Sequence, residues 1–398
     1  MKKIIALLIS LAVMFSVSAA TMAPAADSAF AKVTSTSGVT DIRALGMGGA
    51  AVAVPDNYQS IWANPAGLAK GKVQFSLPSV GVTVYSPLAI SQKIDSSDGI
   101  DDDELVNGVL SSLTRVYGKV ADVDAQLSFS AGGFGLGINV KDTLYSYVPK
   151  TSTGGISSKF YDALAFDAVV GYGLDIPLGF ATIDLGVSAG LSTLMYSDLI
   201  GASDFMSLMS SDDMGAAAAE KFQNIPLAAG YAIPINVGAN VNLPLGFKVG
   251  AVLRNINGTY KMNQAANYAA LEDPEAELEA FEIEVPMTLD AGFAWDISFL
   301  GNFLHPVIAA DVIDVIGLCK SNDFSVENLI NYVRAGVEVK GLWIADARIG
   351  LDRGYWTAGV GLDLALLRVE AAYYWQEMGS YVGEKPQDAF SIKMNIGW

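Results

Sequence analysis

The sequence predicts an all-β protein, a transmembrane antiparallel β-barrel of about fourteen strands with an N-terminal plug. Three observations lead to this prediction. The chain is 52% hydrophobic and only 17% charged, yet beyond its first residues no uncharged apolar run is long enough to span a membrane as a helix. Apolar and polar residues alternate instead in many short segments. The connections between these segments mostly alternate between short and long, as in barrels with short periplasmic turns and long outer loops.

The N-terminus has the features of a secretory signal peptide, which we place at residues 1–31. Lys2 and Lys3 precede an apolar run over residues 4–17, and small residues suited to cleavage follow. The candidate cleavage sites are Val17-Ser18-Ala19 and Ala29-Phe30-Ala31. An uncleaved anchor is the alternative, but Ala, Ser, Thr and Pro rather than Leu and Ile fill the second half of the segment. We therefore divide the chain into the signal peptide, a plug at residues 32–71 and a barrel at residues 72–398.

Charge and the scarcity of Cys and His argue against several classes of function. The net charge of −18 argues against nucleic acid as a partner, because phosphate contacts need clustered Lys and Arg. The single Cys319 rules out a disulfide framework and a Cys-based metal cluster. The single His305 argues against a His-ligated metal and against Ser-His-Asp catalysis. We therefore expect no enzyme activity, no cofactor and no metal.

The alternation is clearest towards the C-terminus. In the last strand the apolar residues Phe390, Ile392, Met394, Ile396 and Trp398 alternate with Ser391, Lys393, Asn395 and Gly397. A soluble β-sandwich can alternate in the same way. Here one face carries charged residues and Gly, and the other carries Trp and Tyr near the strand ends. This favours a barrel whose first face lines a lumen and whose second face contacts lipid. The fourteen predicted strands span residues 73–84, 123–131, 134–147, 159–173, 180–194, 226–242, 245–258, 282–296, 305–313, 332–340, 342–351, 356–364, 366–376 and 389–398.

The barrel must be closed, and its lumen must hold something. Unpaired strand edges cost free energy in lipid, so the sheet is expected to close on itself. Fourteen strands enclose a lumen wider than wall side chains alone can fill, and residues 32–71 are the expected occupant. Charges of both signs on the inward face of the last strands predict an ion-pair network on the lumen wall. These charged residues are Arg334, Glu338, Lys340, Asp346, Arg348, Asp363, Arg368, Glu370 and Lys393.

The most specific motif lies between Arg43 and Leu68. It contains Gly46, Gly48 and Gly49, and later the run Asn64-Pro65-Ala66. A nucleotide-binding interpretation of the glycines is weak, because no strand-loop-helix unit surrounds them. The motif instead resembles the N-terminal plug signature of the FadL family of long-chain fatty-acid channels. It is at least as similar to related outer-membrane families, including PorV-like secretion accessories.

This resemblance implies a barrel in the bacterial outer membrane whose plug blocks a path for hydrophobic substrates. The plug and gating residues would be Gly46, Gly48, Gly49, Asn64, Pro65 and Ala66. Taken by themselves, Pro65 and the glycines favour a compact turn, and the Asn64 amide can satisfy exposed backbone groups. A purely structural plug turn is therefore the alternative to a gate.

The loops and the first strand add further candidates. The helix-like segment 204–222 carries the apolar residues Phe205, Met206, Leu208, Met209 and Met214, which suit an irregular apolar ligand at the place where it enters the barrel. Simple packing of a loop helix is the alternative. Residues 101–104 are acidic and predict a helix start or, less readily, a calcium site, and the acidic residues 272–282 predict a solvated loop.

The first strand changes parity at Pro78-Ser79, which predicts a β-bulge. FadL-type channels are thought to release ligand through a lateral gap at a strand kink. We therefore expect the bulge at Pro78 to open the wall beside Asn64-Pro65-Ala66. A harmless bulge that only bends the strand is the alternative. Pro234 and Pro286 also lie within predicted strands, without a parity change.

The expected function is passive uptake of hydrophobic small molecules, such as long-chain fatty acids, across the outer membrane. The alternative is a PorV-like secretion or surface-interaction accessory without transport activity. Outer-membrane lipids and the barrel-assembly machinery are expected partners. The aromatic residues Phe390 and Trp398 of the terminal strand resemble the signal that this machinery recognises.

Overall fold

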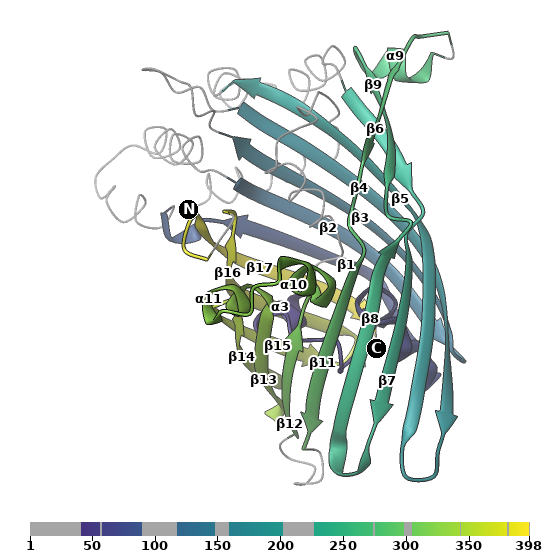
Figure 1. Cartoon of the computed structure of the whole chain (residues 1–398), viewed down its shortest axis with the longest axis vertical. Coiled ribbons are helices and arrows are strands. Elements are labelled where there is room, and N and C mark those ends of the chain that lie inside the picture. Colours follow the sequence, from purple (N-terminus) through teal and green to yellow (C-terminus); the bar gives the residue numbers. More distant parts are fainter. Residues whose placement is uncertain are drawn as a thin grey trace.

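The computed structural model describes residues 41–55, 58–89, 118–147, 159–201, 227–273, 275–297, 305–342, 344–379 and 382–397. Their strands form one antiparallel sheet that closes where β1 pairs with both β2 and β17 (Figure 1). The strand segments are β1 (Gln74–Tyr85), β2 (Gly118–Ala131), β3 (Phe134–Tyr147), β4 (Lys159–Pro177), β5 (Thr182–Gly201), β6 (Leu227–Ala232), β7 (Ile235–Asn242), β8 (Phe247–Ile256), β9 (Tyr260–Ala265), β10 (Glu279–Ile283), β11 (Thr288–Asp296), β12 (His305–Val312), β13 (Val333–Leu342), β14 (Ala345–Asp352), β15 (Tyr355–Leu364), β16 (Leu367–Glu377) and β17 (Pro386–Gly397).

These segments make up fourteen strands, because three neighbouring strands are each divided in two. β6 continues as β7, β8 continues as β9, and β10 continues as β11. Both parts of the β6–β7 strand pair with β5 and with the β8–β9 strand, and β10 and β11 both pair with the β8–β9 strand. Seventeen segments less three divisions leave fourteen. The predicted strand number and antiparallel closure are confirmed.

The helices among the described residues are short. They are α3 (Ile42–Gly46), α4 (Ser60–Ala63), η2 (Pro65–Lys70), η3 (Pro244–Gly246), α9 (Tyr268–Glu272), α10 (Val315–Ser321), α11 (Val326–Leu329) and η5 (Ile330–Tyr332). None of the described helices has the length and apolar content needed to cross a membrane.

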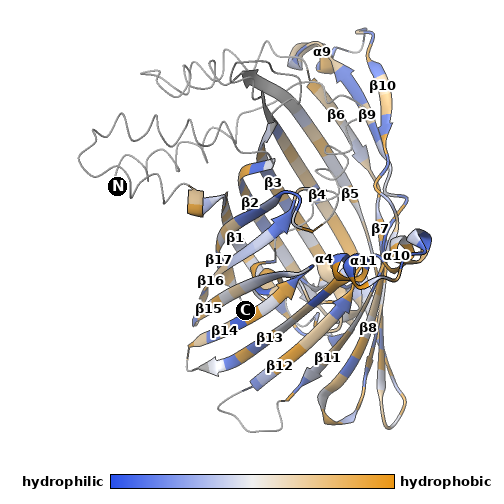
Figure 2. Ribbon diagram, turned by 60° about the vertical axis from the view of Figure 1, so that its left-hand side comes forward, coloured by the Kyte–Doolittle hydropathy of each residue, from blue (hydrophilic) through white to orange (hydrophobic). Residues whose placement is uncertain are grey.

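The two faces of the sheet have opposite character. On β3 the side chains of Leu136, Ile138 and Val140 are exposed, whereas Asn139 and Lys141 are buried. Figure 2 shows this alternation as orange and blue bands along the strands. A soluble protein buries its apolar face, so an exposed apolar face around a buried polar one indicates a wall that separates lipid from a polar interior.

The wall is high on one side and low on the other. β4 and β5 have 19 and 20 residues, whereas β12 and β14 have 8 each. We call the end with the short turns, such as Gly132-Gly133, the lower end of the barrel. Figure 1 shows β4, β5 and β9 rising well above the upper ends of β12 and β13.

Several predicted strands were too short at their upper ends. The prediction stopped at residue 194 for β5 and began β2 only at 123, whereas β4 was cut short at its lower end, at residue 173. The physical reason is visible on β2, where every residue from Gly118 to Asp122 is buried. With both faces of the strand buried, the alternation that marks a strand is lost.

The acidic stretch 272–282 is not the solvated loop that was predicted. α9 ends at Glu272, and β10 pairs with β9 in register from Glu279 opposite Gln264 to Ile283 opposite Tyr260. Backbone pairing holds this segment, while the acidic side chains of Glu279 and Glu282 remain exposed.

The bulge in β1 is present. Ser76 and Ser79 are three residues apart, but their partners on β2, Ser128 and Gln126, are only two apart, and the same shift occurs against β17. Leu77 and Pro78, joined by a cis peptide bond, lie at this shift. Pro234 and Pro286 lie at the divisions between β6 and β7 and between β10 and β11, where Pro cannot donate to the ladder.

Candidate functional site

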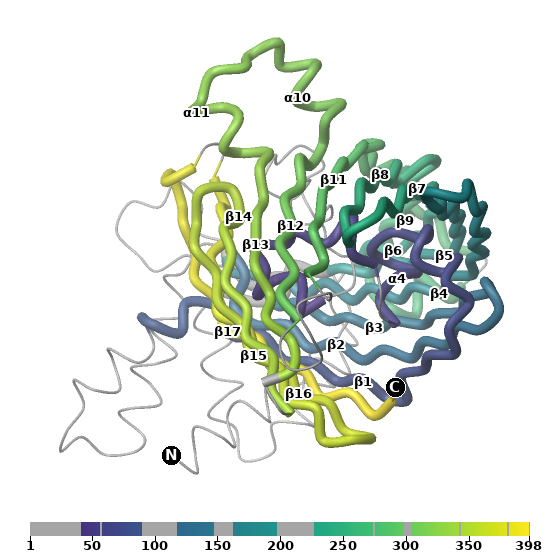
Figure 3. Tube along the Cα trace, turned by 90° about the horizontal axis from the view of Figure 1, so that it is seen from below, coloured from purple at the N-terminus to yellow at the C-terminus, as the bar shows by residue number. Residues whose placement is uncertain are grey.

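The interior of the lower barrel is occupied by residues 41–71, which we call the N-terminal segment. In Figure 3, looking along the barrel, this segment lies within the ring of strands. Its apolar side chains pack on the inner wall in separate clusters. Met47, Ala50, Ala53 and Val54 contact Ala294, Val307 and Ala309, and Ile61 and Leu68 contact Val169. One part of the buried core therefore lies between this segment and the wall.

Short polar caps fix the shape of the segment. The Asp41 carboxylate begins α3 by accepting a hydrogen bond from the Ala44 amide at 3.1 Å. Burial raises the pKa of Asp41, and the Glu370 carboxylate raises it further, whereas the Ala44 N–H lowers it. Asn64 begins η2 in the same way, with its Oδ1 accepting from the Ala66 amide at 3.1 Å.

Gly46, Gly48 and Gly49 lie where the segment touches β13, β14 and β15. Gly48 has φ +66°, and a Cβ there would come within 2.4 Å of the Leu351 carbonyl oxygen. Its amide donates to the Thr357 hydroxyl at 2.9 Å. A Cβ on Gly46 would come within 3.0 Å of the Gly359 Cα. The glycines thus let the backbone lie directly on the wall.

Asn64, Pro65 and Ala66 contact a different part of the wall, formed by β5 and β7. The Asn64 amide is fully buried and donates to the Val52 carbonyl at 2.8 Å and to Asn240 Oδ1 at 3.2 Å. A Cβ on Gly186 would come within 2.1 Å of the Pro65 backbone. The structure therefore places all six predicted residues in one segment, but it holds the two groups against different strands.

A buried carboxylate ties the segment to β13. Glu338 accepts from Arg43 Nε at 2.9 Å and from Arg43 Nη2 at 2.7 Å, and also from Arg348 Nε at 2.8 Å. Both side chains of the Arg43–Glu338 pair are at least nine-tenths buried. The bidentate geometry makes this a strong, directional contact.

The predicted ion-pair network on the lumen wall is confirmed around the Arg43–Glu338 contact. Arg348 also pairs with Glu370 at 3.1 Å, and Arg368 pairs with Asp346 at 2.6 Å. Further pairs are Lys340–Glu338, Arg368–Asp363, Arg334–Asp352 and Lys393–Asp124.

The sequence prediction missed the residues that hold the segment in place. Asp311 Oδ2 accepts from the Ala51 and Val52 amides at 2.8 and 3.0 Å. Lys70 pairs with Asp184 at 2.7 Å, and Arg254 donates to the Trp62 carbonyl at 3.1 Å. Asp311 and Asp184 do occupy inward positions of alternating strands. That signal identifies a lumen-facing residue but not its partner.

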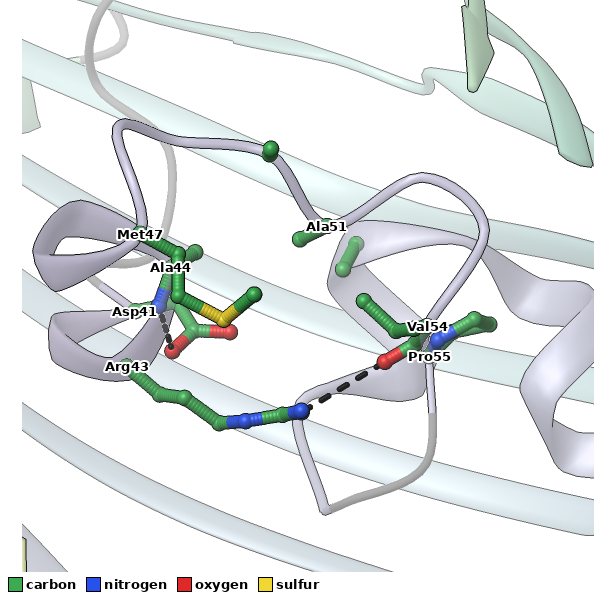
Figure 4. A pocket seen from close by; sticks show the side chains of 9 residues that line it. Asp41, Arg43, Ala44, Met47, Ala51, Val54 and Pro55 are labelled. Atoms are coloured by element: carbon green, nitrogen blue, oxygen red, sulfur yellow. Dashed lines mark hydrogen bonds between the residues drawn. The ribbon is translucent and has the colours of Figure 1, made fainter. Parts of the chain in front are cut away.

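A small pocket lies inside the segment, between α3 and the turn at Val54-Pro55 (Figure 4). Its lining is apolar apart from Asp41 and Arg43. Figure 4 shows Arg43 reaching across the pocket to the Val54 carbonyl, at 3.4 Å. Both charged groups are therefore already engaged with the protein.

The inner wall becomes apolar above the segment on the high side of the barrel. We call this surface the apolar inner cluster. It comprises Ala165, Leu194, Tyr196, Ala228, Ala232, Tyr260 and Met262, with Ala163, Phe281, Ile283 and Val285 packed against it. At its lower border the Ser192 hydroxyl contacts the Tyr260 hydroxyl at 2.6 Å and also bonds Asp167. An apolar patch inside the wall departs from the polar lumen of a water-filled channel.

The division of the three strands borders the apolar inner cluster. It runs through Pro234, Gly258 and Pro286, next to Ala232, Tyr260 and Ile283 of the cluster. Asn255 and Asn257, both with positive φ, bridge the break. Asn257 Nδ2 donates to the Ile233 carbonyl at 3.2 Å, and Asn255 Nδ2 donates to the Pro286 carbonyl at 3.4 Å. These side-chain bonds, with a backbone bond from the Gly190 N–H to the Pro234 carbonyl at 3.2 Å, join the wall here.

The bulge at Pro78 does not lie beside Asn64-Pro65-Ala66, and this part of the prediction was wrong. Gln59 is a residue of the segment that bonds beside it. It exchanges hydrogen bonds at 3.0 and 3.1 Å with Gln126 of β2, the residue that pairs with Ser79. The reason is that the segment crosses the lumen, so that residues 64–66 reach β5 and β7.

Of the remaining predicted residues, Phe390 belongs to the described part of the chain and the others do not. Phe390 lies on β17 with its side chain exposed, opposite Val84 and Tyr373. Residues 101–104 lie outside the described residues. So do Phe205, Met206, Leu208, Met209, Met214 and Trp398.

A closed antiparallel barrel of fourteen strands with an apolar outside and a polar inside is a transmembrane β-barrel, because only closure satisfies every backbone group in lipid. Barrels of this kind belong to the bacterial outer membrane. No family model and no curated protein sequence matches the chain.

Solved structures with a similar fold include two toluene transporters and a FadL homologue. The Pseudomonas putida toluene transporter TodX is 13% identical, with a TM-score of 0.43 over 89% of this chain and 96% of its own. The Ralstonia pickettii toluene transporter TbuX is 11% identical, with a TM-score of 0.48 over 90% and 98%. A Pseudomonas aeruginosa FadL homologue is 11% identical, with a TM-score of 0.44 over 90% and 98%. The class of the protein rests on the barrel's own geometry rather than on these similarities.

Proposed function

We propose that the barrel carries hydrophobic small molecules, such as long-chain fatty acids, across the outer membrane by passive diffusion. The observation that supports this most directly is the make-up of the lumen. The N-terminal segment fills its lower part, and the wall above the segment carries the apolar inner cluster. A polar solute gains nothing from an apolar wall, whereas an apolar one gains about 25 cal/mol for each Å² of surface removed from water.

In this proposal the N-terminal segment acts as the plug. Gly46, Gly48 and Gly49 hold it on one side of the wall, and Asn64, Pro65 and Ala66 hold it on the other. Contacts on separate strands prevent the segment from tilting about a single hinge. The apolar residues Phe205, Met206, Leu208, Met209 and Met214 would line the place where ligand enters.

The ligand would leave sideways, through the wall into the membrane. The bulge at Pro78 is one route, since ladder pairing is interrupted on both sides of β1. The division through Pro234, Gly258 and Pro286 is a second route, because it borders the apolar inner cluster directly. Both routes avoid passage through the plug.

Ligand binding to the purified, refolded barrel tests this function. Leu194 is 2% exposed and lies in the apolar inner cluster, whereas Leu245 is 70% exposed at a lower turn. Leu194→Asn should weaken binding of a fluorescent long-chain fatty acid by about tenfold, since an amide without a hydrogen-bond partner in an apolar site costs about 1–3 kcal/mol and 1.4 kcal/mol is a factor of ten. Leu245→Asn is the matched control and should bind like the parent.

Heat-modifiable migration in gels would confirm that both variants are folded. Equal binding by folded Leu194→Asn and parent protein would contradict a ligand site in the upper lumen. Absence of binding by the parent would favour an accessory protein without transport activity.

A further inference from the structure

The connection between β12 and β13, residues 313–332, projects sideways from the barrel. Figure 3, which shows the molecule from below, has α10 and α11 extending outward beyond the strands. Figure 2 shows α10 extending past the edge of the strands. The connection is therefore directed over the surrounding membrane.

The height at which it leaves the wall is set by the length of its strands. β12 has 8 residues and β13 has 10. A tilted strand of about 9–11 residues just crosses a bilayer. The connection therefore begins at the outer surface of the membrane, whereas the hairpin of β9, α9 and β10 stands much higher (Figure 1).

Three of its exposed side chains are large and apolar, beside the exposed charges of Lys320, Asp323 and Glu327. Phe324 is 58% exposed, Val326 80% and Ile330 39%. The patch is continuous with the lipid-facing side of the wall, because Val333 on the outer face of β13 is also exposed and follows Ile330 within one turn. Ile330 itself lies beside the turn at Gly354, so the patch stays close to the rim.

Local hydrogen bonds hold the patch in this arrangement. Ser325 begins α11 by accepting from the Asn328 amide at 3.3 Å, and Asn328 Nδ2 donates to the Asp323 carbonyl at 2.7 Å. Asp323 accepts in turn from the Ser325 amide at 2.9 Å. The polar groups of this turn are thus engaged with one another, while Phe324 and Val326 point away from the protein.

We propose that residues 313–332 are an interfacial element that inserts Phe324, Val326 and Ile330 among the lipids of the outer leaflet. The three observations above, sideways direction, membrane-level origin and continuity with the lipid-facing wall, all point to lipid as the occupant of this face. An amphipathic element of this kind binds in the plane of the interface through its apolar side. It anchors the low side of the barrel, and the inference is independent of the proposed transport.

Quenching of a fluorescent label by lipid tests this inference. With the single native cysteine replaced (Cys319→Ser), one variant carries Val326→Cys and a control carries Ala269→Cys on the high, exposed α9. Each is labelled with an environment-sensitive fluorophore and refolded into vesicles whose lipids carry a nitroxide near the glycerol backbone. We expect several-fold stronger quenching at position 326 than at 269, reduced by the additional substitution Phe324→Ser.

Equal quenching at the two positions would overturn the proposal, and so would quenching at 326 that Phe324→Ser leaves unchanged. A blue-shifted but unquenched label at 326 would mean that protein rather than lipid covers the patch, and this too would overturn it. Heat-modifiable migration of every variant would show that the barrel itself is folded.

Discussion

Replacing Arg43 with alanine removes the cation that ties the N-terminal segment to β13. Arg43 donates twice to Glu338, at 2.9 and 2.7 Å, and a third time to the Val54 carbonyl at 3.4 Å. The substitution therefore loosens the segment from the wall and also opens the turn at Val54. It leaves the strands of the wall unchanged.

The loss in free energy of unfolding depends on which ion-pair partners Glu338 keeps after the substitution. Removing one partner of a buried ion pair costs about 3–5 kcal/mol when the other charge is left alone. Glu338 keeps Arg348 at 2.8 Å and Lys340 at 3.4 Å, so its charge stays compensated. The loss is then that of hydrogen bonds to a charged group, and we expect about 1.5–3 kcal/mol. The exposed α10 cation gives a matched control, Lys320→Ala, with an effect within about 0.5 kcal/mol.

The assay is denaturant unfolding of the purified barrel in lipid, with a double-mutant cycle. Arg43→Ala, Glu338→Gln and the pair together should give a combined loss smaller than the sum of the single losses, since both substitutions remove the same contact. Limited proteolysis should cut the segment faster in Arg43→Ala than in Lys320→Ala. Strictly additive losses of stability, or equal losses for Arg43→Ala and Lys320→Ala, would refute the conclusion that Arg43 holds the N-terminal segment on β13.

Three further predictions concern the network, the wall and assembly. Arg348→Ala should lower the unfolding midpoint more than Glu277→Ala does, because Arg348 pairs with Glu338, Asp346 and Glu370 in the interior whereas Glu277 is exposed; equal, negligible shifts would count against the network. Deleting Ser79 together with Pro78→Thr should restore continuous pairing of β1 and slow ligand uptake while keeping a stable barrel, and uptake at the parental rate would exclude this lateral route. Pro234→Thr with Pro286→Thr tests the second route in the same way. Deleting Trp398 should sharply reduce the folded, heat-modifiable form in outer-membrane fractions, and unchanged amounts would argue against its part in assembly.

The sequence predicted the wall well because a barrel strand in lipid must alternate. Phe390 and Ile392 face out while Ser391 and Lys393 face in, and the lipid and the lumen together allow no other pattern. The bulge in β1 was predictable for the same reason, since one extra residue reverses the parity of everything that follows. Inward charges such as Glu338 and Arg348 could be identified by their parity alone.

The arrangement of the interior could not be predicted in the same way. Arg43 and Glu338 are 295 residues apart, and no local pattern links them. The course of the segment across the lumen, which brings Asn64 to Asn240 and Gln59 to Gln126, depends on where the closed wall places each strand. The apolar inner cluster was missed because Tyr260 and Met262 lie on β9, in a stretch predicted as a loop, and because no local pattern links them to Ala165 on β4.

Uptake of a fluorescent long-chain fatty acid by cells that carry the barrel in their outer membrane tests the central claim most directly. The parent protein should raise the initial rate well above that of cells without it. Leu194→Asn should lower this rate towards the background while the amount of folded barrel stays the same, and Leu245→Asn should not. A parental rate equal to that of cells without the barrel would contradict the account.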